Sequence, residues 1–272
     1  MPMCYTVRMK KWLILLIVLI LAAMPAAWFF PALQSYAVMG VYSAVQAGES
    51  VMQKNGFSIK MDPAQGWYPF VLTYNADGFS SWSGIEADMS ILYGFGAFDA
   101  AARTSSLYDE NSPFYSAFFG AYAVQKDSGP FGFYGDGSLN MDEVTAAVDY
   151  DYTQLVMRNF GCENPVFSLD EYTVRQGISY AGSDGWTRID ALMRLNGVAH
   201  NFYEHRTAYL QYGRPTRPLQ EDFAVIDMAG RVYAKYFEAF DCTVMLYVMA
   251  PDTQMVDMCD RDILSNAVIA GF

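Results

Sequence analysis

The chain has 272 residues, of which 53% are hydrophobic, and its 17 basic and 29 acidic residues give a formal net charge of minus 12. Every acidic residue lies at or after Glu49. Because nucleic-acid binding rests on neutralising phosphates with Lys and Arg, this charge excludes nucleic acid as an expected partner. It also disfavours docking of the acidic part on anionic lipid.

An apolar run over residues 13–30 contains no charged residue. As a helix it is about 27 Å long, close to the thickness of the bilayer core. Lys10 and Lys11 precede it, and basic residues keep their end in the cytoplasm. We expect a cytoplasmic N-terminus over 1–11 and a transmembrane signal anchor over 12–33. The chain is then a single-pass protein of the cell membrane with its C-terminal domain outside the cytoplasm.

A cleaved signal peptide is the alternative to the anchor. The small residues that would suit cleavage are Ala22, Ala23, Ala26, Ala27 and the Ser35-Tyr36-Ala37 tripeptide. The length of the apolar run and its bulky flank favour the anchor. Met9 followed by two lysines is typical of a signal n-region, which favours Met9 as the true start.

The next segment, 34–55, is predicted to be a membrane-proximal helix, because apolar residues recur at helical spacing until Asn55-Gly56 stops the pattern. From Phe57 the apolar period changes to two. Strands are predicted over 57–61, 68–74, 85–98 and 114–124. One helix interrupts them over 140–160, with Asn140 as N-cap and Gly161 as C-cap.

Further strands are predicted over 166–174, 186–195, 198–212, 223–228 and 232–249. Asn196-Gly197 predicts a hairpin, Ala229-Gly230 a weaker turn, and 252–268 a closing helix capped by Asp252. Residues 56–272 therefore form one extracytoplasmic domain. The fold class is α+β: a transmembrane helix, then a curved antiparallel sheet with two or three packed helices.

Two kinds of residue are candidates for catalysis. Glu86 and Asp88 lie near aromatic residues in the sequence, and glycosidases combine paired carboxylates with aromatic sugar platforms. His200 and His205 are candidate general bases. Their spacing opposes a shared metal ion, since five residues along a strand put them on opposite faces.

One segment resembles the second half of a calcium-binding loop, with Asp136, Asn140 and Glu143 as candidate ligands. The first half of such a loop is missing, and a turn followed by an Asn-capped helix explains the same residues. No metal and no cofactor is therefore expected. Among the cysteines, Cys162 and Cys242 are the better candidates for a disulfide, although buried unpaired cysteines are slightly favoured over any bridge.

The sequence lacks the familiar motifs of hydrolases and nucleotide-binding proteins. The favoured hypothesis is a non-catalytic envelope protein whose acidic extracytoplasmic domain binds a protein partner or a small ligand. Two alternatives stay open. One is an extracytoplasmic hydrolase that acts on glycans through carboxylates, and the other is a lipocalin-like carrier with an apolar cavity inside its sheet.

Overall fold

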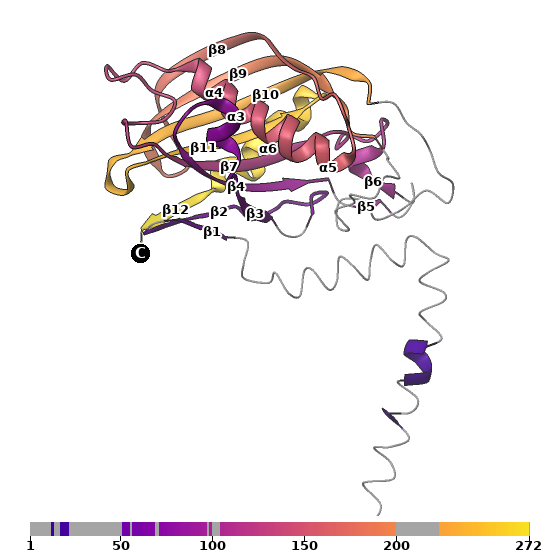
Figure 1. Cartoon of the computed structure of the whole chain (residues 1–272). Helices are drawn as coiled ribbons and strands as arrows, with labels where there is room; N and C mark the ends of the chain where they lie inside the picture. The colour runs from indigo at the N-terminus through magenta and orange to yellow at the C-terminus, as the bar shows by residue number, and fades with distance from the viewer. Residues whose placement is uncertain are drawn as a thin grey trace, which may run out of the picture.

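The computed structural model describes residues 12–13, 17–21, 51–54, 56–68, 71–96, 98–99, 104–199 and 223–271. This part of the chain has an α+β fold with antiparallel sheets and few helices, which confirms the predicted class (Figure 1). The large sheet has seven strands in the order β3-β4-β7-β11-β10-β9-β8, and every neighbouring pair is antiparallel.

The strands of the large sheet are β3 Leu72–Asn75, β4 Asp88–Phe95, β7 Phe118–Gln125, β8 Phe167–Tyr180, β9 Ser183–Asn196, β10 Val225–Phe237 and β11 Cys242–Ala250. A small sheet contains β1 Val51–Lys54, β2 Phe57–Lys60 and β12 Val268–Gly271, and β5 Phe98–Asp99 pairs with β6 Thr104–Ser105. The helices are α3 Phe79–Ser83, α4 Met141–Asp149, the π-helix η2 Tyr150–Met157, α5 Arg158–Phe160 and α6 Thr253–Asp262. Short 3-10 helices are η1 Ser106–Tyr108, η3 Glu238–Phe240 and η4 Leu264–Asn266.

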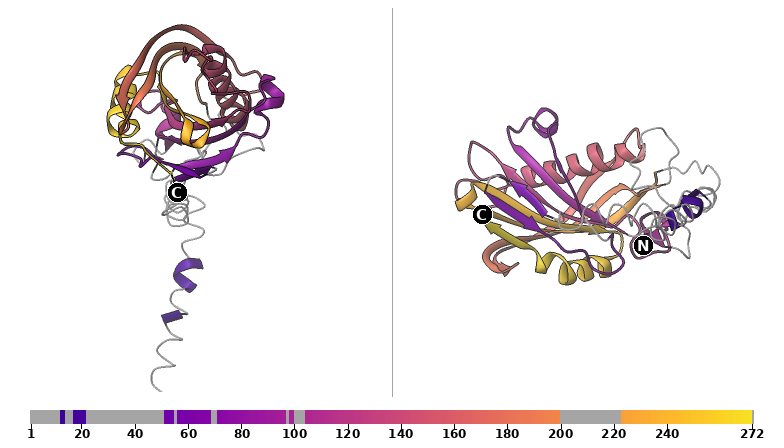
Figure 2. Two further views of the ribbon diagram at one scale, coloured as in Figure 1. Left: turned by 90° about the vertical axis from the view of Figure 1, so that its left-hand side faces the viewer. Right: turned by 90° about the horizontal axis from the view of Figure 1, so that it is seen from below.

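Both faces of the large sheet are packed. The helix formed by α4, η2 and α5 lies on one face, and α6 lies on the other (Figure 2). Alternate residues of β11 enter opposite cores: Tyr247 faces α4 and η2, whereas Leu246 and Val248 face α6. All nine residues of β11 are buried, as expected of a central strand covered on both sides. We call the two clusters the α4-side core and the α6-side core.

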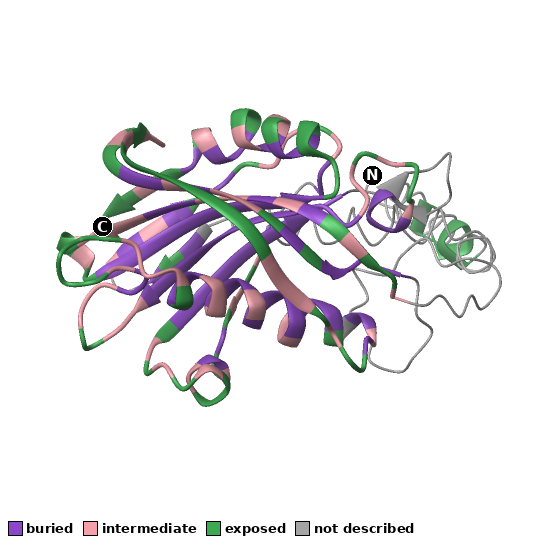
Figure 3. Ribbon diagram, turned by 90° about the horizontal axis from the view of Figure 1, so that it is seen from above, coloured by how far each residue is buried: buried purple, intermediate pink, exposed green. Residues whose placement is uncertain are grey.

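The small sheet completes the α6-side core. Met52, Phe57 and Ile59 pack there together with Met255 and Cys259 of α6. The edge strand β8, in contrast, is exposed over most of its length (Figure 3). Its pairing with β9 shifts register at three places, next to residues 170, 176–177 and 179. The large sheet therefore changes from a doubly packed centre to an uncovered edge.

The strand β1 corrects the predicted helix over 34–55. Residues 51–54 pair with β2, with Met52 and Lys54 buried and Gln53 exposed between them. Gly56 therefore lies between two strands rather than after a helix, and it has a φ of +91°. An Asn-Gly pair in a sequence is also the strongest short hairpin signal, and β1 and β2 on either side of this one pair antiparallel.

Two other predicted turns are wrong. Asn196-Gly197 forms no hairpin with the residues that follow, because β9 already has β8 and β10 as its two neighbours. The side chain of Asn196 instead bridges strand ends, accepting from Val166 N and donating to Phe223 O. Ala229-Gly230 lies inside β10, where a Cβ on Gly230 would come within 2.6 Å of the Met193 side chain. This glycine makes room for a neighbour and does not turn the chain.

Both predicted helices of the domain are confirmed with changed bounds. Asn140 caps α4 by accepting from Glu143 N, and Gly161 ends α5 in the left-handed conformation with a φ of 91°. Asp252 caps α6 by accepting from Gln254 N. α6 ends at Asp262, because η4 and then β12 use the following residues for the small sheet.

Among the described residues, no helix combines the length and apolar character needed to span a membrane. Residues 12–13 and 17–21 are helical. The remaining positions of the predicted anchor over 12–33, and positions 34–50 of the predicted membrane-proximal helix, lie outside the described residues.

Gly120 tests the packing between β4, β7 and β11. A Cβ at this position would collide with the Leu92 carbonyl oxygen and lie 2.9 Å from the Tyr247 ring. We expect Gly120→Ala to lower the free energy of unfolding by about 1–3 kcal/mol, measured by chemical denaturation, because overpacking forces side chains off their preferred rotamers. Gly135→Ala is the control, since nothing lies within 4 Å of a Cβ there. Equal stability of the two variants would contradict this account.

Candidate functional site

A groove on the α6 side of the large sheet is the first candidate site. It has a volume of about 340 Å³ and is bounded by β8, β9, β10 and the first half of α6. Its walls include Glu171, Asp190, Leu192, Arg231 and Asp257. This volume is at the lower end of the range for small-molecule pockets.

The strand register brings these residues together. Glu171 of β8 pairs with Leu192 of β9, which pairs with Ala229 of β10. Asp190 pairs with Arg231 two residues away on the same strands. Because alternate residues of a strand share a face, the side chains of both rows lie on the α6 side.

Arg231 is the centre of an ion network that joins β10 to β9 and α6. Its Nε donates to Asp190 Oδ1 at 2.7 Å, and its Nη1 donates to Asp260 Oδ2 at 2.6 Å. Its Nη2 lies 2.9 Å from Asp257 Oδ1. Each nitrogen of the guanidinium group thus has a carboxylate partner.

The network extends along the sheet. Arg188 donates to both oxygens of Asp190, at 2.7 and 2.8 Å. Tyr233 donates to Asp260 Oδ2 at 2.9 Å, and Tyr180 donates to Asp260 Oδ1. The Tyr180 and Tyr233 rings stack with centroids 3.5 Å apart. These contacts hold the groove wall in one arrangement.

The hydrogen bonds of the network favour the charged forms of Arg231 and Asp190. Burial opposes the charge of Arg231, but its hydrogen bonds to Asp190, Asp260 and Asp257 outweigh burial and keep its pKa above the ordinary value. Burial also opposes ionisation of Asp190, but the hydrogen bonds from Arg188 and Arg231 lower its pKa. Both groups therefore remain ionised at neutral pH.

Some groups in the groove are left for other contacts. The Leu192 side chain is 51% exposed, and that of Asp257 is 67% exposed. The carboxylate of Glu171 has no hydrogen bond or ion pair to the rest of the described chain. The residues that line the groove also carry a formal charge of minus two, because the three carboxylates of Glu171, Asp190 and Asp257 face the single guanidinium group of Arg231.

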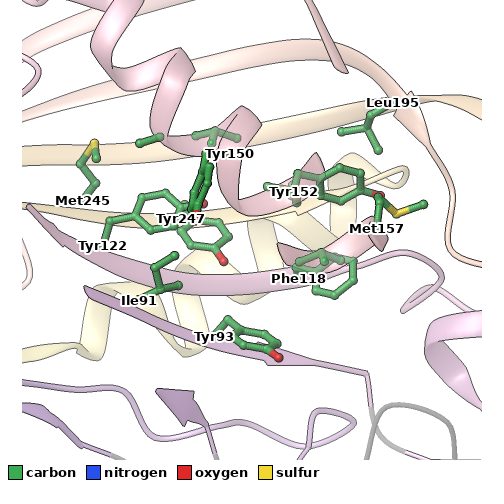
Figure 4. Close-up of a cluster of buried hydrophobic side chains, with 14 of the residues drawn as sticks. Ile91, Tyr93, Phe118, Tyr122, Tyr150, Tyr152, Met157, Leu195, Met245 and Tyr247 are labelled. Atoms are coloured by element: carbon green, nitrogen blue, oxygen red, sulfur yellow. The ribbon is translucent and has the colours of Figure 1, made fainter. Parts of the chain in front are cut away.

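A second candidate is a buried carboxylate, Asp151, in the α4-side core. Three phenol hydroxyls donate to it: Tyr74 to Oδ1 at 2.5 Å, and Tyr122 and Tyr247 to Oδ2 at 2.9 and 3.0 Å. The tyrosines come from β3, β7 and β11, and the rings of Tyr122 and Tyr247 stack beneath the helix (Figure 4). Asp151 thereby ties the helix to three strands.

The π-helix η2 places this carboxylate. The four consecutive residues 150–153 are all buried. In a regular helix with 3.6 residues per turn, four consecutive side chains do not all point toward the same face. Such wider turns occur frequently at functional sites. The hydroxyl of Tyr152, from the same turn, donates to Asn196 O at 2.5 Å. The widened turn thus binds the helix to the sheet at two points.

Burial raises the pKa of Asp151, and the three tyrosine hydrogen bonds oppose that rise without cancelling it. A carboxyl group whose pKa is raised in the folded state stabilises the fold below its ordinary pKa of 3.8. It loses that contribution as pH rises through the raised value.

The Asp151→Asn variant is neutral at every pH and removes this dependence. We expect the stability of the native protein relative to the variant to be highest near pH 4 and to fall toward pH 7, measured by denaturant unfolding at several pH values. Asp62→Asn on the exposed surface is the control and should follow the native profile. Parallel profiles for Asp151→Asn and the native protein would show that Asp151 does not titrate with a raised pKa.

The two candidate catalytic acids lie at and just before the start of β4. Glu86 is exposed in the loop before β4. Asp88 begins β4 and lies 2.9 Å from Nζ of Lys54, whose side chain is only 5% exposed. The neighbouring aromatic residues Trp67 and Tyr68 are buried in opposite cores, so these two rings do not form an exposed platform for a sugar beside the acids.

The other sequence candidates are placed as follows. His200 and His205 lie outside the described residues. Asp136 accepts from Ser138 in a turn, Asn140 caps α4, and Glu143 accepts from Gly132 N and pairs with Lys126. The candidate calcium ligands are thus occupied by the turn and cap. Among the described residues, no group of three or more His, Cys, Asp or Glu side chains is arranged to hold a metal.

The structure does not bring Cys162 and Cys242 together. Both are free and buried, Cys162 in the α4-side core and Cys242 in the α6-side core, so the sheet separates them. Burial raises the pKa of Cys242 to about 12, and Cys259 is also buried and free. Neutral thiols of this kind are weak nucleophiles.

Comparisons of the chain with protein-family models, with curated proteins and with solved structures find no match. The candidate sites therefore rest on their own chemistry.

Neither site is predicted from the sequence. The alternating charges Arg188, Asp190 and Arg194 in a predicted strand were a signal of a polar sheet face, but their partners are distant in the sequence. Asp151 lies between Tyr150 and Tyr152 in the sequence. No local sequence pattern predicts that three other tyrosines, from three separate strands, donate hydrogen bonds to it.

Proposed function

We propose that the described domain is a non-catalytic binding module and that its ligand lies in the groove between α6 and strands β8–β10. The exposure of Leu192 carries the proposal. This large apolar side chain is 51% exposed on a sheet face, beside carboxylates with unused acceptor oxygens. A concave surface that combines apolar contact with a few fixed polar groups is typical of a ligand site.

The ionisation of the groove acids favours binding over hydrolysis. A general acid for glycoside cleavage requires a raised pKa, whereas the pKa of Asp190 is lowered. Asp257 and Asp260 are paired with Arg231. Asp190 therefore supplies charge and hydrogen-bond acceptors rather than a proton. The groove opens on the surface, which does not match the enclosed apolar cavity of a carrier protein.

The proposal includes display of this domain on the outer side of a membrane. Its support is the sequence alone: the uncharged run over 13–30, preceded by Lys10 and Lys11, suits a single-pass anchor over 12–33. We also include curvature of the large sheet, because adjacent strands twist by about 20°.

Ligand-observed NMR on the full-length protein tests the proposal, using a fragment set with equal numbers of cationic, neutral and anionic compounds. We expect at least one fragment to bind and Leu192→Ser to weaken its binding about tenfold, because an apolar side chain that becomes buried contributes about 1.5–3 kcal/mol. Ala229→Trp, which fills the groove, should abolish binding.

Val268→Ser is the matched control, since Val268 is 54% exposed on the small sheet, away from the groove. It should leave fragment binding unchanged. Fragments that bind equally well to the native protein, Leu192→Ser and Ala229→Trp would place the ligand elsewhere and reject the groove.

A further inference from the structure

We infer that the groove selects an organic cation: a primary amine or guanidinium group on a short aliphatic chain. This inference rests on the proposed binding function and names the chemical class of its ligand. The same chemistry occurs in a free aliphatic amine and in the Lys or Arg side chain of a peptide.

The groove lacks a free cationic group that could bind an anion. Arg231 is the basic residue among the described lining residues, and Asp190, Asp257 and Asp260 already occupy its Nε, Nη2 and Nη1. An anionic ligand would have to displace a carboxylate from a bond of 2.6–2.9 Å. It would also meet the surplus negative charge of the groove.

Carboxylate oxygens without a partner remain on two walls of the groove. Asp257 uses Oδ1 for Arg231, and its Oδ2 has no partner in the described part of the chain. Glu171, across the groove on β8, likewise lacks an ion pair among the described side chains. An ammonium group has three donors and no acceptor, so it complements two carboxylates from opposite walls.

An apolar surface lies beside these acids. Leu192, Ala229 and Val256 contribute to the lining between them. A methylene chain can pack on these side chains while its charged end reaches the carboxylates, as lysine side chains do on protein surfaces. The volume of about 340 Å³ suits a small ligand or a single side chain.

Isothermal titration calorimetry of the full-length protein at pH 7 with hexylamine, hexanol and hexanoate tests the selection for charge. The three probes share a chain length and differ in the head group. We expect hexylamine to bind about fivefold to tenfold more tightly than hexanol, hexanoate to bind least, and added salt to weaken only the amine.

Asp257→Asn and Glu171→Gln should each reduce hexylamine affinity about two- to fivefold and leave hexanol affinity unchanged. Glu163→Gln is the matched control, because Glu163 is an exposed acid outside the groove. Comparison of hexylamine with N-acetyl-lysine amide distinguishes a free amine from a peptide side chain, whichever binds more tightly.

Hexanol or hexanoate binding as tightly as hexylamine would overturn the inference and leave the binding function intact. Absence of binding by all three probes would also overturn it; the function itself would then stand only if a Leu192-dependent fragment had been found. If the carboxylate variants behave like Glu163→Gln, the amine is not held by these acids and the inference fails.

Discussion

The burial of both faces of the large sheet is the constraint on which the rest of the structure depends. β11 and β7 lie at the centre, and their side chains alternate between two cores. One helical element covers the first face, and α6 together with the small sheet covers the second. A helix is about 10 Å wide and strands lie about 4.8 Å apart, so α6 covers about two strands. It packs on β10 and β11 and leaves the stretches of β8 and β9 around Glu171 and Leu192 uncovered beside it. The groove lies where this cover ends.

Carboxylates hold the two covers in place by different physical means. Asp151 is buried on the α4 side and accepts hydrogen bonds from phenols of three strands, and no guanidinium or ammonium group among the described residues pairs with it. On the α6 side, Asp260 joins α6 to Arg231 and Tyr233 in a largely buried network that reaches the surface at Asp257. A buried charge with only dipoles around it costs free energy, whereas the paired charges cost less and leave acceptors for other contacts. The second arrangement is the one suited to binding.

Local patterns predicted much of the fold. Alternating apolar residues predicted β2, β4, β7 and β9, and capping residues predicted the helices that begin after Asn140 and Asp252. The single strand predicted over 232–249 instead spans the end of β10, η3 and most of β11. The turns were less predictable, because Asn196 and Gly230 serve packing and bridging roles that depend on residues far along the chain. The site was not predictable for the same reason. It is assembled from three strands in register and one helix, and neither the register nor the position of α6 is encoded within any single segment.

The irregular edges of the large sheet have a consequence for association between copies of the chain. An exposed edge strand offers unpaired backbone groups to any other strand, and this is a common route to aggregation. In β8 the row of unpaired backbone groups is irregular, because its pairing with β9 shifts register at three places. At the opposite edge, β3 has only four residues. Neither edge presents a long, regular template. Self-association by extension of the large sheet at these two edges is therefore disfavoured.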